Sequence, residues 1–586
     1  MFFVSATSQN DRRPRYLRSR RLLILVATVG FVHLSSLHRL QAALPAAADA
    51  IQFVDVTDAS GIQFVHNSPF TPERHTHLTF GSGTGWIDID HDGRPDLFAA
   101  QGVPFVPQES PNLKGGSDSL YRNEGSGRFR DISSLCGLND NDYSMGVSVG
   151  DFNNDGFQDI YVTNFGRNRL LENNGDGTFT ETAVSADVAD AGFGSSCTWV
   201  DLNNDGNLDL FVVNYVDIDP AQYKLCTLEH NGRSYGITCH PRTLSPTCDV
   251  VFQSRGDGRF MDNSLQAGLH HGTAAQGLGV VAADLDADGD TDIYVANDSV
   301  ANHLWFNQGG SRLTDEAVSS GTAFNRSGQR EAGMGTVVGD VDGDGRPDLF
   351  VTNYYGETNT LYRNETEGYF LDVTDEFGLG SSSRLRLGFG TSLFDFDNDG
   401  WLDLFVANGH VHDLPAELGR DEPFAQRPQL FQNQTGKRFR DVSDSAGPYF
   451  NRHLVGRSCA VADYDGDGLQ DLAVGHLNSG LVLLHNQQDG SGTNSLRLEL
   501  VGVQSNRSAI GAVIEVFIGN RKLTRFRVGS SGYLSCDDAC LTIGIGDFKG
   551  PVDVTVQWPG GMREDFPDLQ TGQTNVLIEG RQTDKR

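Results

Sequence analysis

A nine-residue acidic pattern, Asp-x-Asp/Asn-x-Asp-Gly-x-x-Asp, occurs seven times between residues 88 and 471. At the positions that define the pattern, each copy places three or four carboxylates and one glycine within nine residues, a density of like charge that repels itself. A hard cation relieves that repulsion, and an oxygen-only ligand set is typical of calcium. The repetition therefore indicates both a metal and an architecture of seven similar units.

The spacing within each copy assigns a ligand set. Short chelating loops offer side-chain oxygens at positions 1, 3, 5 and 9 and a backbone carbonyl at position 7, while glycine at position 6 permits the reversal. The predicted ligands are Asp88, Asp90, Asp92, Arg94 and Asp96; Asp151, Asn153, Asp155, Phe157 and Asp159; Asp201, Asn203, Asp205, Asn207 and Asp209; Asp284, Asp286, Asp288, Asp290 and Asp292; Asp340, Asp342, Asp344, Arg346 and Asp348; Asp395, Asp397, Asp399, Trp401 and Asp403; and Asp463, Asp465, Asp467, Leu469 and Asp471. We predict up to seven structural Ca²⁺ ions, bound more weakly by the two asparagine-bearing loops.

Strand-like segments repeat around the loops. A glycine-rich apolar run precedes the loop, as at 145–150, and a second apolar run follows it, as at 160–164. A segment of the form L-Y-R-N-x-G-x-G-x-F-x-D-V-T comes next, at 120–133, 170–182, 361–374 and 430–443, and less cleanly at 251–264 and 304–317. Alternation of apolar and polar residues marks these segments as strands. We predict an all-β fold in which residues 51–488 form a seven-bladed β-propeller of four-stranded units.

The two ends of the array complement each other. The seventh copy runs through 481–486 but lacks its F-x-D-V-T strand, and one such strand is left over at Phe53–Thr57. An N-terminal strand that completes the last blade closes the ring and removes exposed sheet edges. We therefore predict that Phe53–Thr57 pairs with the region Leu481–His485.

A second β unit follows the array. Residues 489–494 have the composition of a linker, and 495–586 contain six strand-like runs, at 496–501, 512–518, 522–528, 541–545, 552–558 and 574–578. We predict a small C-terminal β-sandwich-like domain.

The first 50 residues have the composition of an export signal. Six arginines between 12 and 21 precede an apolar run at 22–34, and A-x-A patterns follow at 46–48 and 48–50. The run is shorter than the roughly 20 residues that span a bilayer. We predict an exported protein that is periplasmic, at the cell surface or extracellular. Membrane contact would come only through this segment if it stays uncleaved.

The eight cysteines are too few for a disulfide scaffold in 586 residues. Cys226, Cys239 and Cys248 cluster in an insertion, for which we predict a Cys226–Cys239 bridge. Cys536 and Cys540 flank a short turn and are a second candidate pair. We interpret Cys197 and Cys459, on apolar strands, as buried core thiols.

The formal net charge of -32 argues against a nucleic-acid partner, because no basic stripe is present to displace counterions from phosphates. No nucleophile elbow, phosphate-binding glycine loop or triad spacing occurs. Two histidine pairs, His75 with His77 and His410 with His412, have strand spacing that could chelate a metal. No third ligand is fixed by spacing, so we interpret them as channel-lining or loop-packing residues.

The loops between strands resemble the FG-GAP or VCBS repeats of integrin α-subunit propellers. Together with the phrase at 406–411, the L-Y-R-N segments resemble bacterial relatives of cartilage acidic protein. The stretches at 502–512, 529–535 and 556–561 are similar to the ASPIC/UnbV domain, from which the cysteines at 536 and 540 depart. The resemblance implies an exported calcium-binding propeller with adhesive or recognition roles, metals away from the ligand face and no defined reaction.

Two functions follow as hypotheses. The first is a recognition or adhesion module for a protein or glycan ligand, stiffened by calcium and without a catalytic site. The second is a propeller-based polysaccharide lyase or hydrolase with its site at the channel mouth. Long segments at 217–250 and 409–428 are where either function would be located.

Overall fold

The computed structural model describes residues 52–103, 116–138, 142–218, 225–366, 368–488 and 494–581. All of them belong to one compact unit, Asp49–Arg586. The predicted export segment at 1–50 lies outside these residues, as does the predicted linker apart from Asn494. Within the described part of the chain, no helix has the length and apolar character needed to cross a membrane.

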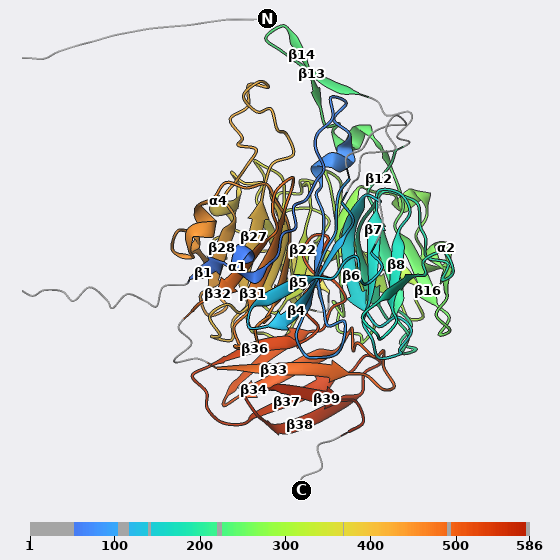
Figure 1. Cartoon of the computed structure of the whole chain (residues 1–586), viewed down its shortest axis with the longest axis vertical. Coiled ribbons are helices and arrows are strands. Elements are labelled where there is room, and N and C mark those ends of the chain that lie inside the picture. Colours follow the sequence, from blue (N-terminus) through green and yellow to red (C-terminus); the bar gives the residue numbers. More distant parts are fainter. Residues whose placement is uncertain are drawn as a thin grey trace, which may run out of the picture. The chain divides into compact units, whose positions relative to one another are not determined.

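Seven four-stranded antiparallel sheets account for the repeats, and each is called a blade here (Figure 1). In chain order, the blades are β2 (Thr84–Ile87), β3 (Asp96–Ala99), β4 (Ser119–Gly125) and β5 (Arg128–Asp131); β6 (Ser144–Gly150), β7 (Asp159–Asn164), β8 (Arg169–Asn173) and β9 (Phe179–Glu181); β10 (Gly194–Val200), β11 (Asp209–Asn214), β16 (Val250–Ser254) and β17 (Phe260–Asp262); β18 (Gly277–Ala283), β19 (Asp292–Asn297), β20 (His303–Asn307) and β21 (Leu313–Asp315); β22 (Thr336–Gly339), β23 (Asp348–Val351), β24 (Thr360–Thr366) and β25 (Tyr369–Asp372); β26 (Gly388–Phe394), β27 (Asp403–Asn408), β28 (Gln429–Asn433) and β29 (Phe439–Asp441); and β30 (Gly456–Ala462), β31 (Asp471–His476), β32 (Val482–Asn486) and β1 (Phe53–Asp55). The prediction of an all-β propeller is confirmed.

The blades form a closed cycle. The first strand of each blade contacts the first strand of the next, from β2 through β6, β10, β18, β22, β26 and β30 back to β2. Strand β1 pairs antiparallel with β32, with Phe53 opposite Asn486 and Asp55 opposite Leu484. The predicted closure by the N-terminal strand is therefore confirmed.

Both faces of each blade are covered by its neighbours, which explains why the middle strands are apolar throughout rather than alternating. Between blades 7 and 1, for example, the rings of Trp86 and Tyr464 stack at 6.4 Å in a cluster with Leu97 and Leu483. Short helices lie in the connections between sheets: α1 (Thr57–Ser60), α2 (Ser264–Ala267), α3 (Ala317–Ser320) and α4 (Gly380–Ser383), with 3-10 turns η1 (Thr76–Thr79), η3 (Pro241–Thr243), η4 (His271–Thr273), η5 (Ser443–Ser445) and η6 (Pro448–Asn451). Burial on both faces, rather than strand pairing alone, therefore stabilises the ring.

The C-terminal unit contains two sheets that enclose one apolar core around Trp558 and Phe566. One sheet has the order β36 (Leu541–Gly546), β33 (Asn494–Val501) and β39 (Thr574–Ile578), and the other β35 (Arg521–Phe526), β34 (Val513–Ile518), β37 (Val552–Gln557) and β38 (Arg563–Leu569). All six predicted strands are present. The seventh, β38, was missed because it is charged and contains Pro567, a residue tolerated here because β38 is an edge strand with a register shift.

The insertion in blade 3 forms the hairpin β13 (Cys226–His230) and β14 (Arg233–Ile237), beside the short pair β12 (Val216–Asp217) and β15 (Ser245–Pro246). The predicted disulfide between Cys226 and Cys239 is present. Cys197 and Cys459 are buried free thiols, as predicted.

The candidate pair Cys536 and Cys540 is wrong, because both are free thiols. The backbone of Cys536 is held along β2: its N–H donates to the Thr84 carbonyl, and its carbonyl accepts from Trp86 N–H, each at 3.1 Å. This pairing fixes Cys536 inside the ring, so it does not turn toward Cys540.

Candidate metal centres and a channel-mouth pocket

The ninth-position aspartate anchors every acidic loop. In the first loop, one oxygen of Asp96 accepts from Ile89 N–H at 3.2 Å and the other from Asn123 N–H at 2.6 Å. The same two bonds recur in the other six loops, at Asp159, Asp209, Asp292, Asp348, Asp403 and Asp471. These carboxylates are buried, so they hold the loop to the adjacent strand.

The carboxylate at position 1 of each acidic loop closes the turn of that loop through a hydrogen bond from the backbone N–H at position 6. Asp88 accepts from the N–H of Gly93 at 2.9 Å, and the equivalent bond is present in all seven loops. The glycine at position 6 has positive φ in each loop, as predicted. The residue at position 4 also has a positive φ in each loop, which we did not predict from the sequence. The residues at this position are His91, Asn154, Asn204, Ala287, Gly343, Asn398 and Gly466.

The fold brings predicted ligands together in most loops. Ligand atoms lie within 4.8 Å of one another in the groups Asp88, Asp90 and Asp96; Asp284, Asp286 and Asp292; Asp340, Asp342 and Asp344; and Asp395, Asp397 and Asp399. In the seventh loop the predicted ligands Asp465 and Asp471 form such a group with His485, which was not predicted. In the two asparagine-bearing loops, the position-3 amides instead donate to the position-5 carboxylates: Asn153 to Asp155 at 3.0 Å and Asn203 to Asp205 at 2.9 Å. The position-7 residues donate backbone N–H to position 5, as Arg94 does to Asp92.

Burial makes negative charge in these loops unfavourable. It raises the pKa of Asp292 to about 9 and that of Asp471 to about 8, and neighbouring loop carboxylates add to both shifts. Two buried oxygens, Asp90 Oδ1 and Asp284 Oδ1, have no hydrogen-bond partner among the described residues. Clustered carboxylates with unpartnered oxygens fit a hard divalent cation, because a cation both satisfies the oxygens and offsets the charge.

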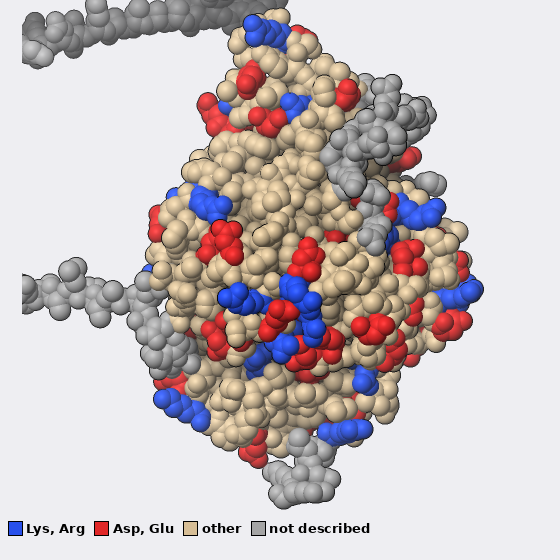
Figure 2. Space-filling view, viewed as in Figure 1, with Lys and Arg blue, Asp and Glu red and all other residues tan. Residues whose placement is uncertain are grey.

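Arginine side chains form ion pairs with carboxylates of the first and fifth loops. The side chains of Arg94 and Arg346, predicted only as carbonyl ligands, turn back to pair with Asp92 and Asp344 of their own loops. Arg122 pairs with Asp90 in the first loop. Figure 2 shows such acidic and basic side chains interspersed on the visible face, rather than separated into patches.

The C-terminal unit contacts several of the acidic loops. Asp151 N–H donates to Ser508 Oγ at 3.0 Å, Arg521 donates to the Asp399 carbonyl at 3.0 Å, and Arg497 pairs with Asp463 at 3.3 Å. Burial lowers the pKa of Arg525, and the nearby charges of Asp395 and Asp340 oppose that shift. Several of the loops therefore lie at the contact between the ring and the C-terminal unit, although each of these loops also has residues partly or fully open to solvent.

One segment of the C-terminal unit, residues 529–538, enters the ring and is called the channel segment here. Its Cys536 pairs along β2, Leu534 accepts from Val147 N–H of β6 at 3.1 Å, and Gly532 exchanges two backbone bonds with Thr336 of β22. It also bonds to β10, β18 and β30 through Ser196, Val280 and Val461. The channel segment thus ties strands from most of the ring together.

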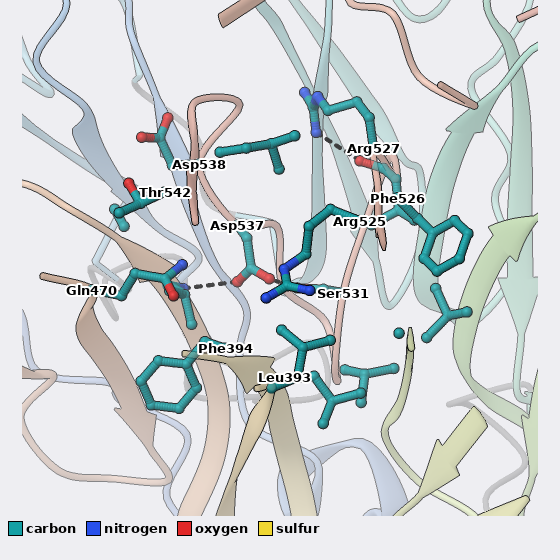
Figure 3. A pocket seen from close by; sticks show the side chains of 18 of the residues that line it. Leu393, Phe394, Gln470, Arg525, Phe526, Arg527, Ser531, Asp537, Asp538 and Thr542 are labelled. Atoms are coloured by element: carbon teal, nitrogen blue, oxygen red, sulfur yellow. Dashed lines mark hydrogen bonds between the residues drawn. The ribbon is translucent and has the colours of Figure 1, made fainter. Parts of the chain in front are cut away.

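Polar groups at the base of the channel segment line a cavity of about 110 Å³ (Figure 3). Asp537 accepts from Ser531 Oγ at 2.6 Å and from Val461 N–H at 2.7 Å. Burial raises the pKa of Asp537 to about 6. These bonds hold the segment in a hairpin-like bend inside the ring.

The tip of the channel segment is Tyr533, which is completely buried. Its hydroxyl donates to the Phe80 carbonyl at 3.3 Å, and its ring lies edge-on to Phe389 at 5.0 Å. Phe80 and Phe389 also line a pocket of about 380 Å³ on the other side. The channel segment therefore supports the floor of that pocket.

This channel-mouth pocket lies at the opposite ends of the first strands from the acidic loops. Some of its residues precede the first strands of blades, as Met334 precedes β22, and others follow the antiparallel second strands, as Tyr215 follows β11 and Asp298 follows β19. The acidic loops join the other ends of these strand pairs. The walls come from both long segments named above, through His240 and Arg242 on one side and His412 and Arg420 on the other. The sequence indicated these segments but not the pocket between them.

A buried arginine holds the mouth together. The guanidinium of Arg457 donates to the carbonyls of Thr79 at 2.8 Å, Gly409 at 3.0 Å and His410 at 3.1 Å. It lies 4.0 Å from the Phe389 ring centroid. Burial lowers the pKa of Arg457 to about 9, so its charge depends on these carbonyls and on the aromatic face.

The two histidine pairs make ring contacts in the same region. His77 stacks on Phe165 at 4.1 Å, and His410 lies 5.3 Å from Tyr354. An ion pair between Arg74 and Asp413 at 2.6 Å joins the segments that carry the pairs. These contacts favour the interpretation of the histidines as packing and channel-lining residues.

Comparison with known families agrees with this geometry. A profile of FG-GAP-like repeats matches residues 88–162, 151–212, 284–351 and 340–406, each match beginning at the first aspartate of an acidic loop. The ASPIC and UnbV profile matches residues 502–584, which include the channel segment. The chain is an FG-GAP-repeat protein with a C-terminal ASPIC and UnbV domain.

Relatives share the repeats over part of their length. Cartilage acidic protein 1 from Homo sapiens is 25% identical over 335 residues, which cover 56% of this FG-GAP-repeat protein and 47% of the relative. Integrin alpha-7 from Mus musculus is 38% identical over 86 residues, 14% of this chain and 7% of the relative. The chain thus spans about half the length of the cartilage acidic protein relatives that it matches.

Solved structures resemble the FG-GAP-repeat protein only loosely. An Agrocybe aegerita lectin specific for non-reducing terminal N-acetylglucosamine gives a TM-score of 0.39 at 16% identity, covering 69% of this chain and 87% of the lectin. The exotype rhamnogalacturonan lyase YesX gives 0.28 at 10% identity, covering 70% of this chain and 90% of the lyase. Because both TM-scores lie below 0.5, neither bears on function.

Proposed function

We propose that this FG-GAP-repeat protein is an exported recognition module whose ring is stabilised by calcium and whose ligand, a protein or glycan, binds in the channel-mouth pocket. The observation that carries the proposal is the separation of two kinds of site along the same strands. Acidic loops follow the ends of the first strands, where the C-terminal unit contacts several of them, while the pocket lies at the strand beginnings. Metal and ligand therefore have different places in the molecule.

A structural role for calcium is supported by how the loops are used. Their carboxylates at positions 1 and 9 are engaged with backbone N–H groups, and the C-terminal unit lies against several loops. Each loop whose ligand set consists of oxygen atoms would take one Ca²⁺, which removes the repulsion between neighbouring aspartates. An ion at this place rigidifies the contact between ring and C-terminal unit, and it cannot touch a ligand in the pocket.

The pocket has the composition of a recognition site. Aromatic rings of Phe80, Tyr215 and Tyr354 line it together with the guanidinium groups of Arg242 and Arg330. Aromatic faces with a few convergent polar groups suit a sugar ring or a peptide side chain. Export is supported by the arginine-rich and apolar composition of residues 12–34. It is also supported by the acidic loops, because calcium sites are occupied more readily outside the cell, where the calcium concentration is high.

A specific observation keeps the lyase or hydrolase alternative in consideration. Asp298 and Glu357 both line the pocket, and burial raises the pKa of each carboxyl. The charge of Asp298 contributes to the rise at Glu357. Acid–base cleavage of a glycoside needs one protonated carboxyl and one ionised carboxylate, and two neighbouring carboxyls that affect each other's pKa can divide these roles.

The test is binding of the calcium-loaded chain to arrays of glycans and peptides, with products assayed in parallel. Arg330→Gln changes a pocket-lining arginine, and Arg326→Gln is the matched control because Arg326 pairs with Asp375 outside the pocket. We expect Arg330→Gln to weaken binding at least tenfold and Arg326→Gln to leave it unchanged.

Equal loss in both variants would contradict recognition in the pocket. New reducing ends or unsaturated uronates, abolished by Glu357→Gln, would replace the recognition function with the enzymatic one.

A further inference from the structure

One position in every blade faces the ninth residue of the acidic loop. Leu472 of β31 pairs with Leu484 of β32, so the antiparallel register places Asp471 opposite His485. The same register in the other blades places one residue opposite each ninth-position aspartate: Arg122, Glu172, Gln253, Phe306, Arg363 and Gln432. The acidic motif does not include this position, and its residue type varies from blade to blade.

Side chains at this facing position reach the loop. Arg122 pairs with Asp90, Gln432 donates to Asp397 at 2.6 Å, and Glu172 accepts from Asn153 at 3.3 Å. Each contacted residue is the third of its loop, a predicted metal ligand. The facing position can therefore supply or withhold a ligand at the metal site.

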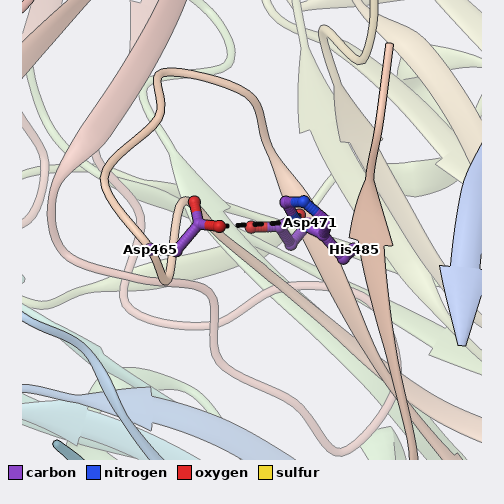
Figure 4. A group of neighbouring side chains, drawn as sticks. All are labelled: Asp465, Asp471 and His485. Carbon is purple, nitrogen blue, oxygen red and sulfur yellow. Dashed lines mark hydrogen bonds and ion pairs between the residues drawn. The ribbon is translucent and has the colours of Figure 1, made fainter. Parts of the chain in front are cut away.

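Only in blade 7, among the seven facing positions, is this residue a histidine. His485 Nδ1 lies 3.2 Å from Asp471 Oδ1 and 3.6 Å from Asp465 Oδ2 (Figure 4). The three ligand atoms lie within 4.8 Å of one another. Two ligands of one ion, each bound at about 2.1 Å, lie roughly 3.0 to 3.4 Å apart, so this spacing fits three donors around a small cation.

The nitrogen donor, and not the arginine beside the loop, distinguishes the seventh site, because arginines also pair with ligand carboxylates of the first and fifth loops. Arg497 Nε lies 3.3 Å from Asp463 Oδ2, and Asp463 is the first ligand of this loop. Imidazole nitrogen is a poor ligand for Ca²⁺ and a good one for Zn²⁺, which takes histidine together with carboxylates.

We propose that the seventh loop is a mixed nitrogen and oxygen site that binds Zn²⁺ through Asp465, Asp471 and His485, while the other loops bind Ca²⁺. This rests on the loops being metal sites, as proposed above. The zinc site would lie in the blade that β1 closes, next to the strand pair β1 and β32.

The test uses the whole chain in millimolar calcium, titrated with zinc by calorimetry, with metal content measured after gel filtration. We expect one zinc per chain with calcium retained. His485→Gln introduces the residue that blades 3 and 6 carry at this position, and it should weaken zinc binding at least tenfold without loss of calcium. His453→Gln is the control, because His453 is exposed in the same blade and contacts no acidic loop in the described structure.

Location is checked separately by crystals soaked in zinc, with anomalous scattering at the zinc edge. A peak beside His485 supports the site, and it keeps the test valid even if the His485→Gln variant folds poorly. Zinc binding that is unchanged in His485→Gln, or absent while calcium binds, would overturn the zinc assignment alone. Absence of both metals would instead refute the calcium role in the proposed function.

Discussion

Replacing Tyr533 tests whether the channel segment fastens the C-terminal unit to the ring. The side chain is completely buried, lies against Phe389 and donates a hydrogen bond to the Phe80 carbonyl. Truncating a buried aromatic residue to alanine costs about 3 to 5 kcal/mol, and the lost hydrogen bond adds about 1 kcal/mol. Tyr533→Ala should therefore lower the free energy of unfolding by about 5 kcal/mol, and Tyr533→Phe by only about 1 kcal/mol.

Urea unfolding of the calcium-loaded chain measures both values. Trp86, Trp199 and Trp305 report on the blades and Trp558 on the C-terminal core, so single-tryptophan versions separate the two transitions. Because the segment joins ring and C-terminal unit, Tyr533→Ala should lower both midpoints. Val576→Ala is the control, since Val576 is a half-exposed residue of β39 and its truncation should change stability by less than about 0.5 kcal/mol.

The reasoning fails if Tyr533→Ala lowers the free energy of unfolding by less than about 1 kcal/mol, because removing a fully buried aromatic side chain costs more than that. It also fails if the phenylalanine and alanine variants are equally destabilised, since packing then contributes nothing beyond the hydroxyl. A loss confined to the C-terminal transition would place the tyrosine in that unit alone.

Three further predictions concern the loops and one buried acid. Removing calcium with EGTA should lower the melting temperature by many degrees, because each site saturated at about 100 times its Kd contributes about 2.7 kcal/mol, and an unchanged melt in scanning calorimetry would contradict structural calcium. Ala287→Gly should stabilise the protein by about 1 kcal/mol in urea unfolding, because Ala287 has a φ of 63° that glycine adopts without strain. Gly289→Ala in the same loop, at a φ of 95°, should destabilise the protein, and a shift of the same sign in both variants would contradict the strain argument. Burial raises the pKa of Glu331 from 4.5 to about 7, so the folded state holds the proton more tightly and stability should fall by about 3 kcal/mol as pH rises from 4.5 to 7. In Glu331→Gln that fall should be smaller, and an identical pH profile of the melting temperature would exclude Glu331 as its source.

The parts of the fold that the sequence predicted are those fixed by local, repeated chemistry. An acidic loop needs its glycine at position 6 and its aspartate at position 9, so each loop and its flanking strands could be located from spacing alone. The closure by β1 could also be predicted, because the strand missing from the seventh copy matches the one left over at Phe53. The Cys226–Cys239 bridge was predicted correctly, but the place of these two cysteines on one insertion with Cys248 did not by itself select that pair.

The missed features depend on contacts between distant segments. The channel segment has no periodicity of its own, and its conformation comes from strands that precede it by hundreds of residues, such as β2 and β6. This is why Cys536 and Cys540 looked like a bridge from their spacing. His485 was missed for the same reason, since only the register of β31 and β32 places it on the acidic loop.

The pairing of β1 with β32 also sets the order in which the ring can fold. Strand β1 pairs with β32, with Phe53 opposite Asn486, so the first strand of the ring cannot pair until the last strand has formed. Contacts of such long sequence separation form slowly, because the entropy of closing the intervening chain is lost before the pairing is gained. Until then blade 7 has an open edge, a template for pairing with other chains. Calcium binding to the earlier loops would shorten that interval by ordering six blades before the seventh is complete.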